Sequence, residues 1–100
     1  MREIELESVY RHFKGNYYYV KEIAICSETS EQHVVYQALY GENITYIRRL
    51  DMFLEPIDEN RKDNITHQNY RFESARSLNL DNDETISACV KKLNNFRRKI

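Results

Sequence analysis

The sequence predicts a mainly β protein, a small antiparallel β-barrel or curled sheet followed by a carboxy-terminal α-helix. Four short segments rich in β-branched and aromatic residues follow one another in the first half, and turn-forming residues separate them at close intervals. The last twenty residues change to the spacing of an amphipathic helix. A chain of 100 residues has room for one core, so we expect one β domain over residues 1–75 and a basic helical extension over residues 76–100.

Each of the four segments has the pattern of a strand. Residues 9–13 alternate polar and apolar side chains and run into a Lys-Gly-Asn turn, which tolerates the positive φ of a tight hairpin. Residues 17–25 are aromatic and β-branched and predict a long second strand. The third and fourth strands are expected at residues 33–40 and 44–48, on either side of a Gly-Glu-Asn turn.

The segments after the fourth strand are shorter or helical. Residues 50–54 have helical spacing and are stopped by Pro56, because the residue before a proline is pushed out of the α region. A polar loop follows, and residues 70–72 are a candidate closing strand. Residues 81–83 offer an N-cap and an acidic first turn for the final helix. The apolar stripe of that helix is Ile86, Val90, Leu93 and Ile100.

The charges are balanced in number but segregated along the chain. The 15 basic and 16 acidic residues argue against attraction of the whole surface to nucleic acid or to an anionic membrane. Residues 85–100 contain five basic residues and no acid, so residues 1–84 hold ten basic and sixteen acidic residues, a net charge of −6. The helix is therefore expected to lie on its own acidic β domain, on an acidic partner, on nucleic acid, or on a second copy of the chain.

No segment has the pattern of a membrane span or of a signal peptide. The longest stretch without Asp, Glu, Lys or Arg, residues 32–41, is about half of what a bilayer span needs. Cys26 and Cys89 lie far apart and form no CxxC pair. These features predict a cytoplasmic protein with reduced thiols.

Three motifs resemble the bacterial domain-of-unknown-function 1653 (DUF1653) family. Residues 10–15 read YRHFKG, residues 34–41 read VVYQALYG and residues 48–53 read RRLDMF, where the family pattern is roughly YxHFKG, VVYxALYG and RPLxMF. The resemblance implies a compact SH3-like β-barrel of bacterial origin, with no established activity. Arg49 stands at the usual proline of the third motif, and the basic helix lies outside the pattern.

The first motif carries the most specific chemistry. On an alternating strand Tyr10 and His12 share a face, and Lys14 extends that face at the turn. Together with Arg48 they are suited to an anion or a hydrogen-bonding ring. The alternative without a ligand is that Tyr10 and His12 are partly buried residues of the barrel wall and that Lys14 is a solvated charge in the turn. The candidate ligand-binding residues are Tyr10, His12, Lys14, Arg48, Tyr36 and Tyr40.

A non-catalytic binding module is the leading functional hypothesis, with an anionic or heteroaromatic ligand such as a nucleotide or single-stranded RNA. The alternative is a protein–protein interaction or assembly module, such as a homodimer. An enzyme acting on a small metabolite comes third, because no carboxylate in its motif would orient His12. The three histidines are scattered and neither cysteine has a close partner, so we expect no metal and no cofactor.

Overall fold

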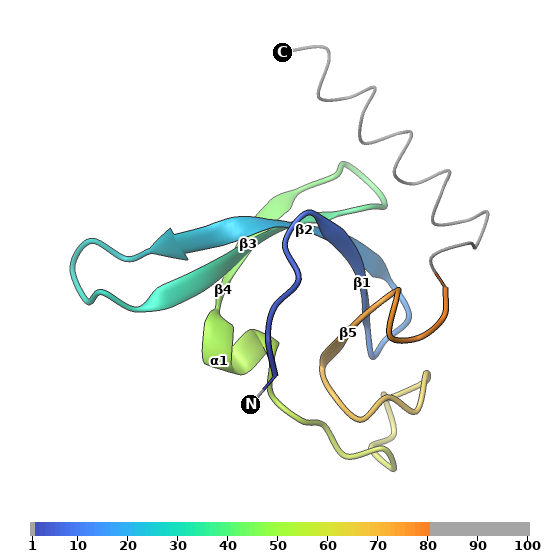
Figure 1. Cartoon of the computed structure of the whole chain (residues 1–100). Helices are drawn as coiled ribbons and strands as arrows, with labels where there is room; N and C mark the ends of the chain where they lie inside the picture. The colour runs from blue at the N-terminus through green and yellow to red at the C-terminus, as the bar shows by residue number, and fades with distance from the viewer. Residues whose placement is uncertain (1, 81–100) are drawn as a thin grey trace.

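One antiparallel sheet of five strands forms the centre of the computed structural model, which describes residues 2–80 (Figure 1). The strands are β1 (Ser8–His12), β2 (Tyr17–Ile25), β3 (Gln32–Ala38), β4 (Thr45–Arg49) and β5 (Phe72–Ser74). They lie in the order β4-β3-β2-β1-β5. The mainly β prediction is confirmed, whereas the predicted helix over residues 81–100 lies outside the described residues.

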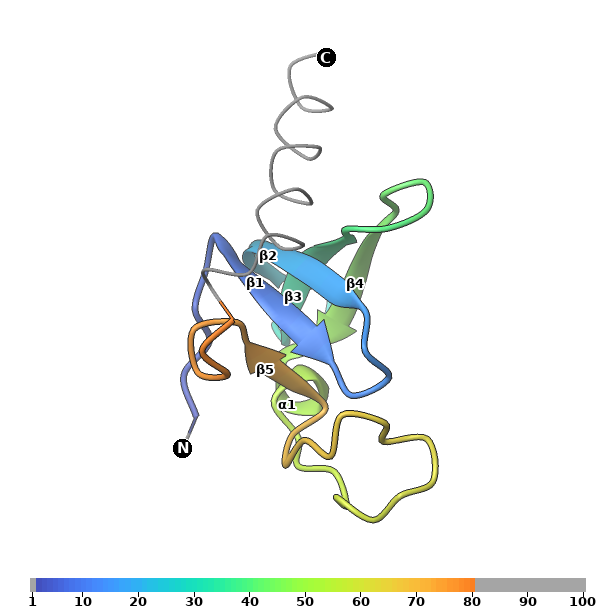
Figure 2. The same cartoon turned by 90° about the vertical axis from the view of Figure 1, so that its right-hand side faces the viewer.

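The predicted SH3-like β-barrel is not confirmed, because β4 and β5 are the two edges of the sheet and no ladder joins them within residues 2–80. After β4 the chain leaves the sheet through the single turn of α1 (Leu50–Phe53). It then follows a long connection, whose two ends are joined by an isolated bridge between Pro56 and Tyr70, before it reaches β5 (Figure 2). This excursion separates the two edge strands, so the sheet stays open.

Two turns set the register of the hairpins. Gly15, at φ +100°, donates its N–H to the His12 carbonyl at 2.8 Å and closes the turn from β1 to β2. Asn43, at φ +56°, closes the turn from β3 to β4, where its Nδ2 donates to the Ala38 carbonyl at 2.9 Å. The turn residues expected from the sequence therefore do form the hairpins.

An aromatic core lies between the sheet and α1. Phe53 of α1 stacks on Phe72 of β5 with ring centroids 4.0 Å apart and an angle of 6° between the planes. The Tyr10 ring packs edge-on against Phe53 at 5.5 Å. The other buried members of this core are Val20, Val34 and Tyr36. Phe53 follows the edge strand β4, and Phe72 lies in the opposite edge strand β5. Their contact therefore joins the two edges of the curled sheet.

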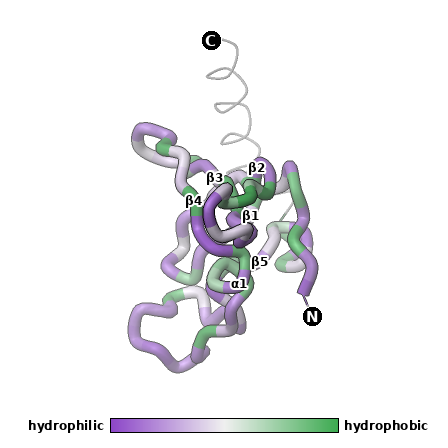
Figure 3. The backbone as a smooth tube through the Cα atoms, turned by 90° about the vertical axis from the view of Figure 1, so that its left-hand side faces the viewer, coloured by the Kyte–Doolittle hydropathy of each residue, from purple (hydrophilic) through white to green (hydrophobic). Residues whose placement is uncertain are grey.

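Hydrogen bonds rather than apolar burial hold the connection between α1 and β5, which is largely hydrophilic (Figure 3). Asn64 is fully buried, and its Nδ2 donates to the Gln68 carbonyl at 2.9 Å and to the Asp58 carbonyl at 3.1 Å. The Gln68 N–H in turn donates to Asn64 Oδ1 at 3.1 Å. The buried amide is thus satisfied on both sides, as a polar group out of water must be.

Truncating Phe53 to alanine should destabilise the fold strongly. The Phe53→Ala variant removes a fully buried ring from the stack with Phe72, and such changes cost about 3–5 kcal/mol of unfolding free energy. The measurement is equilibrium unfolding in urea. Met52→Ala is the control, because Met52 is the exposed neighbour in the same helix and its loss should cost less than about 1 kcal/mol. Equal losses for both variants would contradict the assignment of the core.

Candidate functional site

Four tyrosine rings gather on the face of the sheet that carries the core. Tyr18 of β2 and Tyr36 of β3 lie 5.4 Å apart between ring centroids, and Tyr46 of β4 lies 5.8 Å from Tyr36. Tyr40, just beyond β3, lies 5.6 Å from Tyr18. These separations are typical of interacting aromatic pairs. We call these four tyrosines, together with Arg48 and His12, the aromatic site.

The aromatic site has a buried base and open walls. Tyr36 is only 5% exposed, whereas Tyr40 and Tyr46 are 41% and 40% exposed. The Tyr18 and Tyr40 hydroxyls are joined by a hydrogen bond of 2.7 Å. Exposed ring surface next to a fixed base is what a planar ligand needs for stacking.

Arg48 brings a positive charge to this aromatic surface. It stands opposite Val34 in the pairing of β3 with β4, and its Nε donates a long hydrogen bond of 3.4 Å to the Tyr36 hydroxyl. Its guanidinium carbon lies 6.0 Å from the centroid of the Phe72 ring. In the described part of the chain no carboxylate forms an ion pair with Arg48. The guanidinium therefore keeps donors for an anionic group.

His12 is neutral at physiological pH and has a defined tautomer. Burial, together with the positive charges of Arg71, Lys14 and Arg48, lowers its pKa from 6.5 to about 4. The Lys14 backbone N–H donates to His12 Nδ1 at 3.1 Å, so the ring proton of the neutral form is on Nε2. The imidazole lies 4.8 Å from the Phe72 ring. It can thus offer one N–H donor without a charge.

The Tyr18 phenol keeps its proton near neutral pH. Burial raises the pKa of Tyr18, and the hydrogen bond with Tyr40 raises it further. A protonated hydroxyl both donates and accepts hydrogen bonds. The aromatic site therefore combines neutral polar groups with one guanidinium.

The six sequence-predicted residues do not all lie together. His12, Arg48, Tyr36 and Tyr40 belong to the aromatic site. Tyr10 is buried in the core, where its hydroxyl accepts a hydrogen bond from the Glu5 N–H at 2.9 Å and burial raises its pKa. Lys14 is exposed at the turn, and its Nζ lies 3.8 Å from an Asp63 carboxylate oxygen. Tyr10 is thus a core residue rather than part of the site, while Lys14 stands at the margin of the site.

Sequence reasoning left Tyr18, Tyr46 and Phe72 off the list of site residues. Tyr18 lies in a run of three tyrosines, and a run gives no sign of which ring faces the core. Tyr46 pairs directly with Tyr36, and Phe72 pairs with His12. These cross-strand pairings would have identified Tyr46 and Phe72 as neighbours of the site. They could not be predicted, because the pattern of one strand does not indicate which residue of the next strand lies opposite.

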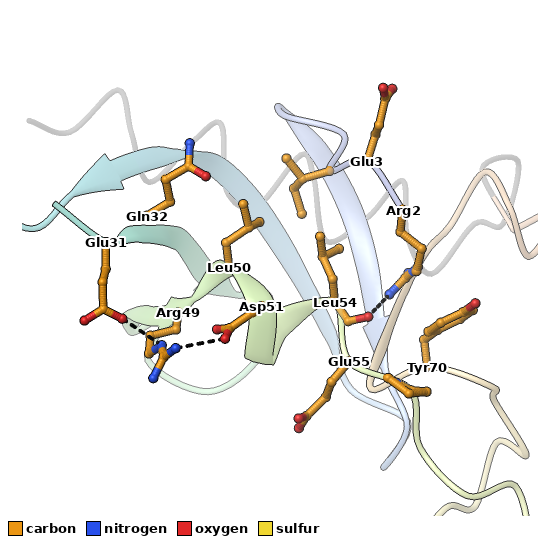
Figure 4. Close-up of a pocket in the computed structure, with 12 residues that line it drawn as sticks. Arg2, Glu3, Glu31, Gln32, Arg49, Leu50, Asp51, Leu54, Glu55 and Tyr70 are labelled. Atoms are coloured by element: carbon orange, nitrogen blue, oxygen red, sulfur yellow. Dashed lines mark hydrogen bonds and ion pairs between the residues drawn. The ribbon is translucent and has the colours of Figure 1, made fainter.

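A hollow, separate from the aromatic site, lies between the amino-terminal segment and α1 (Figure 4). It is a groove of about 860 Å³ with an apolar floor that includes Ile4, Leu50 and Leu54. At its rim Arg49 Nε is 3.0 Å from Glu31, and Arg2 donates to the Leu54 carbonyl at 2.9 Å. None of the six candidate residues lines this groove.

Neither a metal site nor a membrane-spanning helix is found within residues 2–80. Among residues 2–80 no group of three or more His, Cys, Asp or Glu side chains is placed to hold a metal ion. None of the helices described here has the length and apolar character needed to cross a membrane.

Comparisons with known proteins identify relatives of the fold. The family model described as "Protein of unknown function (DUF1653)" matches residues 8–74. A crystal structure of a DUF1653 protein from Bordetella bronchiseptica is similar to this chain, with a TM-score of 0.55 and 31% sequence identity over 68% of this chain and 83% of that one. A comparison with curated proteins found no match.

The His12 environment predicts an unusual titration. By NMR the His12 ring should titrate with a midpoint about 4, well below the 6.5 of a free imidazole. Between these values the unfolded imidazole binds a proton that the folded one does not, so the unfolding free energy should fall as the pH is lowered through this window. His12→Gln should show a smaller fall in melting temperature between pH 6.5 and pH 4. A His12 midpoint near 6.5 would contradict the burial of the ring.

Proposed function

We propose that this chain, which belongs to the DUF1653 family, is a non-catalytic binding module for a ligand with an aromatic ring and an anionic group. The observation that carries the proposal is an Arg48 guanidinium without an ion pair in the described part of the chain, set among tyrosines that are partly exposed. A nucleotide or a short single-stranded RNA has both groups.

The recognition would divide between stacking and hydrogen bonding. The ring of the ligand would lie against the exposed faces of Tyr40 and Tyr46, as bases lie on aromatic side chains. The anionic group would accept hydrogen bonds from Arg48, and His12 Nε2–H would add a neutral donor. Lys14 at the margin would attract the same charge over a longer distance.

The same geometry favours binding over catalysis. A general base works best with a pKa near the working pH, and the pKa of His12 lies at about 4. Its Nδ1 accepts a backbone N–H, whereas a catalytic histidine of a triad donates from Nδ1 to a carboxylate. His12 is thus better suited to donate a hydrogen bond than to take up a proton.

Two finer parts belong to this proposal. We infer an SH3-like architecture, supported by the order β4-β3-β2-β1-β5 and by the one-turn helix that precedes β5. We infer a bacterial cytoplasmic location, supported by the similar protein from Bordetella bronchiseptica and by the Cys26 thiol, which forms no disulfide within residues 2–80.

Replacement of Arg48 tests the site directly. Nucleotides, modified nucleosides and organic anions are screened by thermal shift, because a ligand of the native state raises the melting temperature. For any hit, Arg48→Gln should weaken binding about tenfold, which corresponds to the loss of one charged hydrogen bond. Affinity should also fall as salt is raised. Arg76→Gln is the matched control, since Arg76 is an exposed arginine in the turn after β5.

Equal affinity of both arginine variants for a hit would place its binding elsewhere. If no compound of the screen binds, light scattering at micromolar concentration tests the alternative, in which the exposed tyrosine rings bury against a second copy. A stable dimer that dissociates in Tyr46→Ala would favour that assembly role.

A further inference from the structure

The edge strand β4 exposes apolar side chains along its length. Four of its five residues are exposed. Ile47 is 67% exposed and Tyr46 is 40% exposed, and Ile44, just before the strand, is 49% exposed. An exposed apolar strand at the edge of a sheet is a surface to which another strand can pair, and monomeric proteins protect such edges. The edge of β4 is therefore a candidate interaction surface.

The backbone of β4 directs hydrogen-bonding groups out of the sheet. The Ala38 N–H donates to the Ile44 carbonyl at 2.9 Å, so these two residues are a hydrogen-bonded pair. Such pairs recur at every second residue of an antiparallel ladder, and the register then directs the N–H and the carbonyl of Tyr46 to β3. The same groups of Thr45 and Ile47 point away from β3, toward the free edge.

No described element pairs with these outward groups. Within residues 2–80, β4 has β3 as its only neighbour in the sheet, and Figure 2 shows β4 at the margin. Outside the strand pairings, no backbone hydrogen bond among the described residues involves Thr45 or Ile47. A strand added at this edge would satisfy both N–H groups and both carbonyls.

We propose that β4 pairs antiparallel with β4 of a second copy of this chain, about a two-fold axis at Tyr46. This register places Thr45 opposite the partner's Ile47, and Ile47 opposite the partner's Thr45. Each of these pairs exchanges its N–H and carbonyl groups with the other copy, so that every outward group finds a partner. The two five-stranded sheets then become one continuous sheet.

The side chains of β4 also fit a second copy of the same strand. The two Tyr46 rings would face each other at the axis, and a facing aromatic pair stabilises neighbouring strands. Thr45 would pack against the partner's Ile47 on the other side of the sheet. Arg48 would stand opposite the partner's Ile44, which leaves the two Arg48 residues about 14 Å apart along the strands. Salt screens repulsion over that distance, so the pairing brings no like charges together.

Edge pairing brings a residue of the partner to the aromatic site. Tyr46 belongs to that site, and the partner's Tyr46 would lie beside it at the axis. The inference does not rest on the proposed ligand, because a monomer can bind a nucleotide through Arg48. It also differs from burial of the tyrosine rings alone, since it uses the backbone of Thr45, whose side chain lies on the opposite face.

Disulfide trapping in the full-length chain tests both the edge and the register. In a Cys26→Ser, Cys89→Ser background, Tyr46→Cys should give a covalent dimer under mild oxidation, because opposed residues that share no hydrogen bond have Cα atoms about 4.5 Å apart. Ile47→Cys is the matched control. Ile47 is more exposed than Tyr46, but the partner's Ile47 would lie diagonally across, about 8 Å away, which is too far for a disulfide.

The yield of covalent dimer on a non-reducing gel gives the answer. A yield several-fold higher with Tyr46→Cys than with Ile47→Cys supports the proposal. Equal yields, a higher yield with Ile47→Cys, or no dimer with either variant overturn it.

Light scattering at micromolar concentration is a second test, and it needs no added thiol. The unmodified chain should have the mass of a dimer. Thr45→Pro should have the mass of a monomer with its sheet retained in circular dichroism, because the proline removes an N–H that points away from β3.

Tyr46→Lys should dissociate the dimer as well, since it sets two ammonium groups face to face. Ile65→Lys should leave the dimer intact, because Ile65 is equally exposed but lies in the connection between α1 and β5. A monomeric unmodified chain, or a dimer that persists in both folded β4 variants, would overturn edge pairing. Nucleotide binding that depends on Arg48 would stand in either case.

Discussion

The stack of Phe53 on Phe72 is the contact on which the rest of the arrangement depends. One ring follows directly from the edge strand β4 and the other lies in the opposite edge strand β5, so a single aromatic contact joins the two ends of an open sheet. Phe72 also lies beside His12, Tyr18 and Tyr36, and the Arg48 guanidinium stands above it. The core and the aromatic site therefore share one ring, and the position of the site follows from the packing of the fold.

Local features of the sequence predicted the strands well, and non-local features were harder. The predicted second strand over residues 17–25 coincides with β2, because β-branched and aromatic residues continue without a turn signal. The positive φ of Gly15 confirms the first hairpin turn. Barrel closure is different, because it depends on whether β4 and β5 meet, and α1 with the connection that follows it keeps them apart. No local sequence pattern indicates whether two strands so far apart in the chain lie side by side.

The candidate site shows the same division. His12, Tyr36 and Arg48 were predicted and do lie close together, because each stands on the core side of its own strand. Tyr10 shares that side but lies under Phe53, so its ring is part of the core rather than of a surface. The buried amide of Asn64 is a similar case: the sequence indicated a polar loop, and only the folded partners show that this residue holds it. Whether a residue is buried depends on which residues from distant parts of the sequence pack against it.

The hydrogen bond between the hydroxyls of Tyr18 and Tyr40 can form in two directions, and each direction leaves a different hydrogen-bonding group of Tyr40 facing outward. Either oxygen can be the donor in this bond. If Tyr18 donates, the Tyr40 hydroxyl proton is free to point outward toward an acceptor. If Tyr40 donates, its outward lone pair is free to accept a hydrogen bond. The two states differ only in the rotation of two hydroxyl hydrogens, with every heavy atom in place. In the proposed binding role, the tyrosines would accommodate ligands of opposite hydrogen-bonding character, and Arg48 and His12 would provide the selectivity among them.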